Sequence, residues 1–567
     1  MRQYVGQNMT IDKDVPIPLR DGSFVMANVF RPPGDGPWPV IMNYGPYGKD
    51  VHFSEFMPAV WATLQDNHPE ITSRSSLTHL TFETPDPEIW TTFGYALVRV
   101  DSRGAGKSPG LLHPNSPDEF QDAYEAVEWA AAAPWSNGKV GLLGISYYAS
   151  GQWMIAQLRP PGLAALQPWQ GTCDFYRDRT RQGGIFSSGF VDMWWNRCVV
   201  ENQHGSASSR FTDYFTGERN TGPALAAEEL AANRPDYIQD ILDHPLEDDW
   251  YKARSADLEQ IEVPALVVAN WGGLQVHLRG TLLGFEGISS TEKWLRVQRG
   301  SYFMTFYHPD NVDIQRRFFD RYLKDQTDAW TGEPVVKVDV RSMDDGVARS
   351  LTATAWPLPD CVEQRFHLDA GAGALSTEPP STRRQVSFEA RKGAAVFSTG
   401  PLRQDLTFAG PILLRLRLAS TTSEADVFAT LQAFNADGSE AGFEDSTLAP
   451  SPVSQGWLRA SHRSVDPSRS GFLRPFHDHH RHQPLVPGDA YDLEVELWPG
   501  SLSLPRGAEL RLTISGLDFQ SSGEGLANMG HDHPCDRPEP EFAGTHTIST
   551  GPDVPAYLAL PRLEQQS

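Results

Sequence analysis

Hydrophobic and polar positions alternate with two different periods along this chain. In the first third, short apolar runs alternate with helix-like segments, which is typical of a mainly parallel sheet covered by helices. Residues 118–133 (DEFQDAYEAVEWAAAA) begin with acidic residues and continue with good helix formers, so we expect a crossover helix there. The expected strands of this sheet are residues 23–30, 39–43, 96–101, 140–145, 265–270 and 294–298.

Two later stretches depart from this rhythm. Residues 154–250 are aromatic, rich in arginine and broken by loops, and they interrupt the series of strands, so we interpret them as a helical cap over the sheet. After about residue 330, short alternating runs such as LRLRLAS and YDLEVELW replace the helical signals. We therefore predict an α/β core in two parts (1–153 and 251–330), the cap between them, and an all-β jelly-roll sandwich over 331–567.

The composition excludes several classes of protein. With 567 residues, 40% hydrophobic and 21% charged, the chain is typical of a globular protein with more than one core. Its formal charge of −24 would repel nucleic acids and anionic membrane surfaces, so neither is an expected partner. We expect a small-molecule substrate, and a homo-oligomer is left open.

Location and cofactor use follow from what the sequence lacks. The first fifteen residues lack the apolar core of a secretion signal, and no later stretch is apolar enough to span a bilayer, so we expect a soluble, cytoplasmic protein. The four cysteines are far apart, and we expect them to be reduced. There is no phosphate-binding glycine loop, and the histidine-rich run at 474–484 is interpreted as a solvated loop. We expect neither a cofactor nor a metal.

A Gly-x-Ser sequence follows the strand predicted for residues 140–145. A serine at a strand-to-helix turn stands exposed above the sheet edge, and small neighbours let the backbone turn sharply. Gly144 stands two residues before Ser146, as such an elbow requires. Tyr148 stands two residues after it, where the commonest pattern has glycine. The motif alone is therefore a weak signal.

The surrounding segments make the signal stronger. MNYGPYGKD, YALVRVDSRGAGKSPG, PWSNGKVGLLGISYYASGQW and PWQGTCDFYRD occur in this order, and GWLRASHRS and TGPDVPAYLALP follow later. Together they resemble the CocE/NonD (cocaine esterase-like) family, which is allied with the X-prolyl dipeptidyl peptidases, over nearly the whole chain. The resemblance implies an α/β-hydrolase core, an inserted cap and a C-terminal jelly roll. It also implies that Ser146 is the nucleophile, with the Tyr147 backbone N–H and the Tyr47 hydroxyl as oxyanion donors.

Two positions depart from the pattern of that family. The acid normally follows a late strand in a W-x-D segment, and Gly273 occupies its place in VPALVVANWGGLQVHLRG. The histidine position, in WLRVQRGSYFMTFYH, is occupied by Tyr302. A tyrosine with an unperturbed pKa of about 10 is a poor base at neutral pH, and glycine cannot orient a base. The ordinary Ser-His-acid relay therefore cannot be drawn from these positions.

Three interpretations remain open at this point. In the first, a nearby histidine replaces the base: His308 lies six residues after Tyr302, and His277 lies four residues after Gly273. The protein would then be a serine esterase, amidase or acyltransferase. In the second, the enzyme carries out non-hydrolytic acid–base or positioning chemistry, such as cyclisation, elimination or rearrangement. In the third, it is a catalytically inactive ligand-binding protein.

The expected reacting centre is common to the first two interpretations. It consists of Ser146, Tyr47 and Tyr147, with Tyr302 beside them. The substrate is expected to be a small or medium apolar metabolite that carries a carbonyl group. Because two of three triad positions are substituted, the sequence alone slightly favours the non-hydrolytic interpretation.

Overall fold

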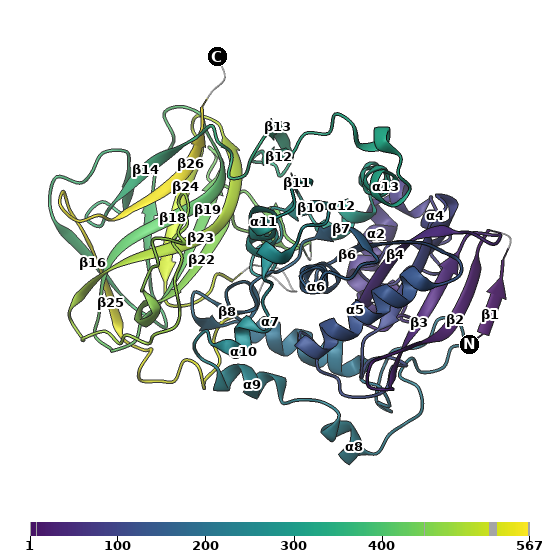
Figure 1. Cartoon of the computed structure of the whole chain (residues 1–567). Coiled ribbons are helices and arrows are strands. Elements are labelled where there is room, and N and C mark those ends of the chain that lie inside the picture. Colours follow the sequence, from purple (N-terminus) through teal and green to yellow (C-terminus); the bar gives the residue numbers. More distant parts are fainter. Residues whose placement is uncertain (1, 7, 447, 521–529, 565–567) are drawn as a thin grey trace.

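Two large β-sheets organise the molecule, one in each half of the chain (Figure 1). The structure is a computed structural model that describes residues 2–6, 8–446, 448–520 and 530–564. In Figure 1 an α/β half, purple to teal, lies beside a green to yellow half built of strands. The prediction of an α/β core followed by an all-β domain is confirmed.

The first sheet has a parallel centre and antiparallel edges. Neighbouring strands are parallel from β5 to β12, whereas β1, β2 and β3 at one edge and β13 at the other pair antiparallel. The order of the sheet is β1 (Arg2–Val5), β2 (Thr10–Pro18), β3 (Phe24–Arg31), β5 (Ala96–Asp101), β4 (Trp38–Gly45), β6 (Ser136–Ile145), β7 (Leu163–Trp169), β10 (Ala265–Asn270), β11 (Lys293–Gln298), β12 (Val336–Arg341) and β13 (Val347–Ala353).

All the strands predicted for this sheet are present, and the sheet extends beyond them. β7 falls inside the segment interpreted as cap, yet it pairs with β6 and β10. Its short apolar run LAALQPW has no period that separates it from the apolar stretches of a cap. β12 and β13 lie after residue 330 but also pair with the first sheet. The inserted segment therefore starts after β7, and the first sheet continues to Ala353.

Helices cover the first sheet, and one of them was predicted closely. α5 (Pro117–Ala132) is the expected crossover helix, and the Ser116 side chain caps it by accepting from the Glu119 backbone N–H. The other helices of the core are α1 (Phe53–Phe56), α2 (Pro58–Asn67), α3 (Pro69–Thr72), α4 (Pro87–Thr92), α6 (Tyr147–Ala156), α11 (Leu278–Gly287), α12 (Tyr302–Tyr307) and α13 (Pro309–Leu323), with a short 3₁₀ turn, η5 (Thr327–Trp330).

The segment between β7 and β10 forms the cap. Its aromatic side chains Trp194, Trp195 and Tyr237 belong to the same buried cluster as Tyr47 and Tyr147 of the core. The cap therefore packs on the edge of the sheet where β6 ends. Its elements are η1 (Phe175–Thr180), β8 (Arg181–Gln182), β9 (Ile185–Phe186), α7 (Ser188–Met193), η2 (Trp194–Val199), η3 (Val200–Asn202), α8 (Ala227–Ala232), α9 (Tyr237–Asp243), α10 (Asp249–Lys252) and η4 (Leu258–Gln260).

The second sheet forms the all-β domain. β26 pairs with both β14 and β18, so the strands between them close into a ring around an apolar core. The jelly-roll description stays a prediction. The elements are β14 (Cys361–Asp369), β15 (Ala374–Ser376), β16 (Arg384–Glu389), β17 (Ala394–Ser398), β18 (Leu406–Ser420), β19 (Asp426–Phe434), β20 (Phe443–Glu444), β21 (Pro450–Ser451), β22 (Ser454–Arg459), η6 (Ala460–His462), β23 (Ala490–Leu504), β24 (Glu509–Ser515), β25 (Thr545–Thr550) and β26 (Tyr557–Leu563).

Among the helices of the described residues, none is both long enough and apolar enough to cross a membrane.

Candidate active site

The turn between β6 and α6 has the geometry of a nucleophile elbow. Ser146 lies directly after β6, with φ +57° and ψ −109°, a backbone conformation that residues other than glycine rarely adopt. Its backbone N–H donates to the Trp169 carbonyl oxygen (3.1 Å). A Cβ on Gly144 would lie 2.5 Å from the Tyr148 Cβ, so glycine is required there. The larger Tyr148 therefore fits the elbow because residue 144 has no side chain.

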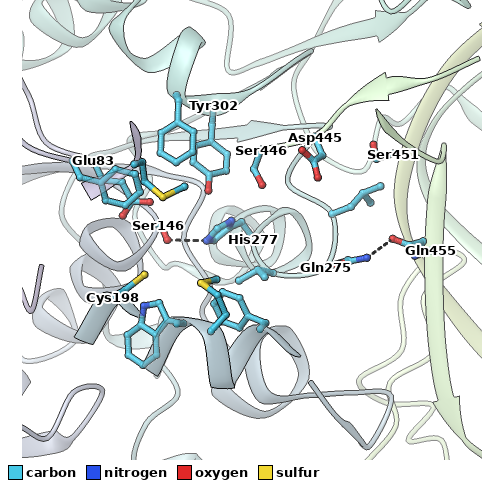
Figure 2. A pocket seen from close by; sticks show the side chains of 18 of the residues that line it. Glu83, Ser146, Cys198, Gln275, His277, Tyr302, Asp445, Ser446, Ser451 and Gln455 are labelled. Carbon is cyan, nitrogen blue, oxygen red and sulfur yellow. Dashed lines mark hydrogen bonds between the residues drawn. The ribbon is translucent and has the colours of Figure 1, made fainter. Parts of the chain in front are cut away.

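His277 lies beside the serine. Its Nε2 atom is 2.9 Å from the Ser146 Oγ atom, and Figure 2 shows the two side chains facing each other. The residue immediately precedes α11, at the carboxyl end of β10. Burial, with the nearby Arg179 charge, lowers the pKa of His277 to about 3, so the imidazole is neutral and can accept a proton. The structure thus places His277, one of the two histidines considered from the sequence, at hydrogen-bond distance from Ser146.

The place of the missing acid is filled by an amide side chain. A Cβ on Gly273 would lie 2.4 Å from the Gln170 Oε1 atom, so a side chain at residue 273 would require Gln170 to move. Gln170 itself is anchored by its Nε2 atom, which donates to the Asn270 carbonyl oxygen (2.9 Å). Among the described residues, no carboxylate hydrogen-bonds to the ring of His277. Within the described residues, the arrangement is a hydrogen-bonded pair of Ser146 and His277.

Tyr302 lines the pocket without forming part of that pair. Its ring meets the ring of His277 edge to face, with 5.4 Å between centroids. Burial, with the neighbouring Glu83 carboxyl, raises the pKa of Tyr302 well above its usual value, so the phenol stays neutral. Tyr302 therefore supports the imidazole by packing and cannot act as a base.

His308 is the other histidine that the sequence offered, and that expectation is wrong. It lies between α12 and α13, where its side chain is 41% exposed and its Nδ1 atom accepts from the Asp310 backbone N–H. α12 directs Tyr302 into the pocket, so the end of this short helix, where His308 follows, lies outside it. Distance along the chain could not reveal this, because the outcome depends on the direction of one helix.

Tyr47 and Tyr147 occupy the places expected for the oxyanion donors. The Tyr47 hydroxyl lines the pocket and accepts a hydrogen bond from the Trp194 indole N–H (2.8 Å), which leaves its own proton available. The Tyr147 side chain points away and donates to Glu119, and its ring stacks on Trp194 (5.8 Å between centroids). The backbone N–H of Tyr147 donates to the Glu83 carboxyl group.

Glu83 is a pocket residue that the sequence analysis missed. It lies in the loop between α3 and α4, with a carboxyl group that is buried and adjacent to the Ser146 hydroxyl. In Figure 2 the Ser146 oxygen lies between Glu83 and His277. The segment TFETP carries no motif and no distinctive period, so no local signal could have identified it.

The pocket around these groups is apolar and closed by all three parts of the chain. The core contributes the reacting groups, the cap contributes Trp194 and Phe190, and the all-β domain contributes Gln455 and Phe519. The cavity is small, about 70 Å³. Such a pocket favours a small, uncharged group because a charge would lose its hydration without compensation.

Family models match both halves of the chain. The model of the X-Pro dipeptidyl-peptidase (S15 family) matches residues 21–303, and that of the X-Pro dipeptidyl-peptidase C-terminal non-catalytic domain matches residues 328–559. Among curated proteins, the cocaine esterase of Rhodococcus sp. is 22% identical and covers 99% of this chain and 100% of its own length. A putative serine esterase of Mycobacterium tuberculosis is 24% identical over 75% of this chain and 78% of its own length.

Solved structures give the same picture. A CocE/NonD family hydrolase from Staphylococcus aureus is 30% identical, covers 98% of this chain and 94% of its own, and superposes with a TM-score of 0.85. An α-amino acid ester hydrolase is 16% identical, covers 99% of this chain and 98% of its own, and has a TM-score of 0.68. The second likeness concerns the fold alone.

Proposed function

The chain belongs to the CocE/NonD family of hydrolases, and from this premise we propose that it is a serine hydrolase in which Ser146 is the nucleophile and His277 the base. The observation that carries the proposal is the 2.9 Å contact between the Ser146 Oγ and His277 Nε2 atoms. A nucleophile and a neutral base at hydrogen-bond distance are the minimum for acyl transfer through a covalent intermediate.

The proposed reaction follows the usual two halves of serine hydrolysis. The Ser146 oxygen attacks the acyl carbon of an ester or amide while its proton passes to the His277 Nε2 atom, and the carbonyl electron pair moves onto oxygen. The Tyr147 backbone N–H and the Tyr47 hydroxyl donate to this oxyanion. The leaving group departs with the proton from His277, and water releases the acyl group by the same steps.

The absence of an acid partner has a cost in rate. In a full triad the carboxylate stabilises the imidazolium that forms in the transition state. Here burial disfavours that cation, as the lowered pKa of His277, about 3, reflects. We therefore expect slower turnover than in relatives with a complete triad.

The pocket suggests the substrate class. Its walls are formed mainly by apolar and aromatic side chains, among them Phe190, Met193, Trp194 and Leu274. The small cavity suits a short apolar acyl group joined to an alcohol or amine that extends towards the opening. A substrate with a charged acyl group would be disfavoured.

Hydrolysis is better supported than the non-hydrolytic chemistry that the sequence analysis favoured. That interpretation rested on the apparent lack of a base, and His277 provides a neutral imidazole at the serine. The ligand-binding interpretation is weakened by the same contact. Neither cyclisation nor rearrangement is needed to account for the arrangement of the site.

The test uses a fluorophosphonate and a series of activated esters of increasing acyl length. Stoichiometric labelling of Ser146 by mass spectrometry, lost in Ser146→Ala and strongly slowed in His277→Ala, is expected. His308→Ala is the matched control, because this exposed histidine lies outside the pocket. Labelling that persists in Ser146→Ala, or none in the wild type, would sink the proposal.

A further inference from the structure

Glu83 is held rigidly against the elbow in an unusual backbone conformation. Its φ of +62° is one that glutamate rarely adopts. Its backbone carbonyl oxygen accepts from the Ile145 N–H (3.2 Å), one residue before the nucleophile. Arg99 donates to the Pro85 carbonyl oxygen (2.9 Å) and Tyr307 to that of Thr84 (3.1 Å), so the residues that follow are fixed as well. Strained backbone that its surroundings hold in place is typical of functional positions.

The Glu83 carboxyl group is buried and forms no ion pair among the described residues, although the charge of Arg179 acts on it. The residue is 2% exposed, and its Oε2 atom has no hydrogen-bond partner among the described residues. None of the ion pairs within the described part of the chain involves Glu83. Burial raises the pKa of Glu83 well above its usual range, although contact with the Ser146 hydroxyl and the charge of Arg179 act in the opposite direction. A carboxyl group in such a place is neutral and carries a proton that it can donate.

The position of this proton donor coincides with the place where negative charge develops. The carboxyl group is in contact with the Ser146 side chain and with the Tyr147 backbone N–H, one of the two proposed oxyanion donors. It also lines the pocket beside Tyr47, the other proposed donor. An acyl oxygen bound between these two donors would therefore lie next to the Glu83 carboxyl group.

We propose that Glu83 is a further catalytic residue, whose carboxylic O–H group donates a hydrogen bond to the oxyanion formed when Ser146 attacks the acyl carbon. The inference rests on the proposed serine hydrolysis. The proton stays on Glu83 while it shares the oxyanion charge, and it is not consumed when the intermediate collapses. Together with Tyr47 and Tyr147, Glu83 gives the site a third donor, which offsets part of what the missing triad acid would supply.

The alternative role for Glu83 is that of an ionised base, and two variants separate the roles. Glu83→Gln keeps the shape and an N–H donor but cannot accept a proton as a carboxylate does, whereas Glu83→Ala removes both functions. The readout is the rate constant for fluorophosphonate labelling of Ser146, because the phosphoryl oxygen uses the same donors. Glu83→Gln is expected to label within about fivefold of the wild type, and Glu83→Ala on the order of 100-fold more slowly.

Glu88→Gln is the matched control, because this glutamate is more exposed and lies outside the pocket. Equal and large losses in Glu83→Gln and Glu83→Ala would overturn the inference in favour of an ionised base. No loss in Glu83→Ala, with unfolding temperatures unchanged, would overturn it as well. An unlabelled wild type would instead mean that the proposed function itself has failed, and the inference with it.

A second measurement does not depend on activity. An infrared difference spectrum between the wild type and Glu83→Gln at neutral pH should contain the carbonyl band of a protonated carboxylic acid. A carboxylate band in its place would overturn the inference. At alkaline pH the wild-type labelling rate should fall as this group ionises, whereas the rate of Glu83→Gln should not fall with it.

Discussion

Two groups of buried ionisable side chains lie near the carboxyl ends of neighbouring strands, and they differ in how their charges are balanced. One is the pocket, with Ser146, His277 and Glu83. The other, which we term the lysine–aspartate cluster, lies near strand β2, which carries two of its residues. It consists of Lys13, Lys49, Lys107, Asp14, Asp50, Asp101 and Asp213.

In the lysine–aspartate cluster, each buried charge has partners of the opposite sign. The Lys13 Nζ atom lies 2.7 Å from Asp50 and 2.9 Å from Asp213, with all three side chains at most 1% exposed. Burial alone would raise the pKa of Asp50, but the ammonium groups of Lys49 and Lys13 hold it below its usual range. Pairing keeps Asp50 charged, while burial still raises the pKa of Asp101 to about 6 and lowers that of Lys13, and we expect the role of the cluster to be structural.

In the pocket, the same degree of burial acts on groups without charged partners. The pKa of His277 is lowered and that of Glu83 is raised, both chiefly by burial, which favours the neutral form of each group. The comparison teaches that burial with pairing preserves charge, whereas burial without pairing leaves groups that can accept or donate protons. The two regions meet at one turn: Lys49 lies two residues after the pocket residue Tyr47, and its backbone N–H donates to Asp101 of the cluster.

The largest expected effect tests the pocket. His277→Ala should lower kcat/KM on activated esters by on the order of 10⁴-fold, because His277 is the one histidine of the described residues that lines the pocket and the neighbouring Glu83 is proposed to be protonated. Denaturant unfolding should show a much smaller change in stability. Activity within tenfold of the wild type would show that His277 is not the base.

The next-largest effect is expected from a substitution that breaks the lysine–aspartate cluster. Asp50→Asn leaves buried ammonium groups without their full complement of carboxylates, so we expect a loss of about 3–5 kcal/mol in the free energy of unfolding. Urea denaturation measures it. Asp21→Asn is the control, because Asp21 forms an ion pair with Arg103 at the surface, where little change in stability is expected. Similar losses in both variants would contradict the structural role of the cluster.

Tyr47→Phe should reduce kcat by about 100-fold with little change in stability, because it removes one proposed oxyanion donor. Steady-state kinetics on an ester that the wild type hydrolyses provide the measurement. Tyr44→Phe serves as the control, since this buried tyrosine of β4 lies outside the pocket. An equal loss in both variants would point to packing rather than to a hydrogen bond.

The two regions should respond to pH with opposite signs. Above a pH of about 4.5 the unfolded chain has lost the Glu83 proton, whereas the folded chain keeps it because the pKa of the buried group is raised. The stability of the fold therefore decreases as pH rises from about 4.5 towards the raised pKa, by about 1.4 kcal/mol per pH unit. Asp50, whose pKa is lowered, contributes stability above the pKa of an unfolded aspartate, about 3.9, and loses it as pH falls. Glu83→Gln should therefore gain stability over the wild type with increasing pH. A constant difference between pH 5 and 8 would mean that Glu83 is ionised.

The smallest expected effect is a nearly flat response of labelling to mild acid. Because the pKa of His277 is lowered to about 3, the fluorophosphonate labelling rate should change less than about twofold between pH 5 and 7. A histidine with an ordinary pKa of about 6.5 would lose about tenfold per pH unit well below that value. Circular dichroism over the same range controls for unfolding. A steep fall of the labelling rate below pH 6.5 would show that His277 is solvated and not buried.

Much of the fold could be predicted from local patterns. Strands β5 and β10 and helix α5 were predicted because the period of apolar residues and the capping signals lie within each segment. The elbow at Ser146 was also predicted, because the weak signal of a strand, a glycine and a serine was strengthened by the family-like segments around it. β7 was missed because its apolar run resembles the cap that follows it.

The sequence by itself determined the fold and predicted Ser146 as the nucleophile, with Gly273 and Tyr302 at the positions where the resemblance places the acid and the histidine. Only the tertiary structure decided what replaces them. His277 reaches Ser146 because the loop before it is held at Gln275. The Gln182 side chain of the cap donates to the Gln275 backbone carbonyl oxygen, and the Gln275 side chain donates to Gln455 of the all-β domain, as Figure 2 shows for the second bond. Those contacts join residues 93 and 180 positions apart. Periodicity and motifs report on neighbours in the chain, whereas a proton relay depends on distances that only the packing of distant segments sets.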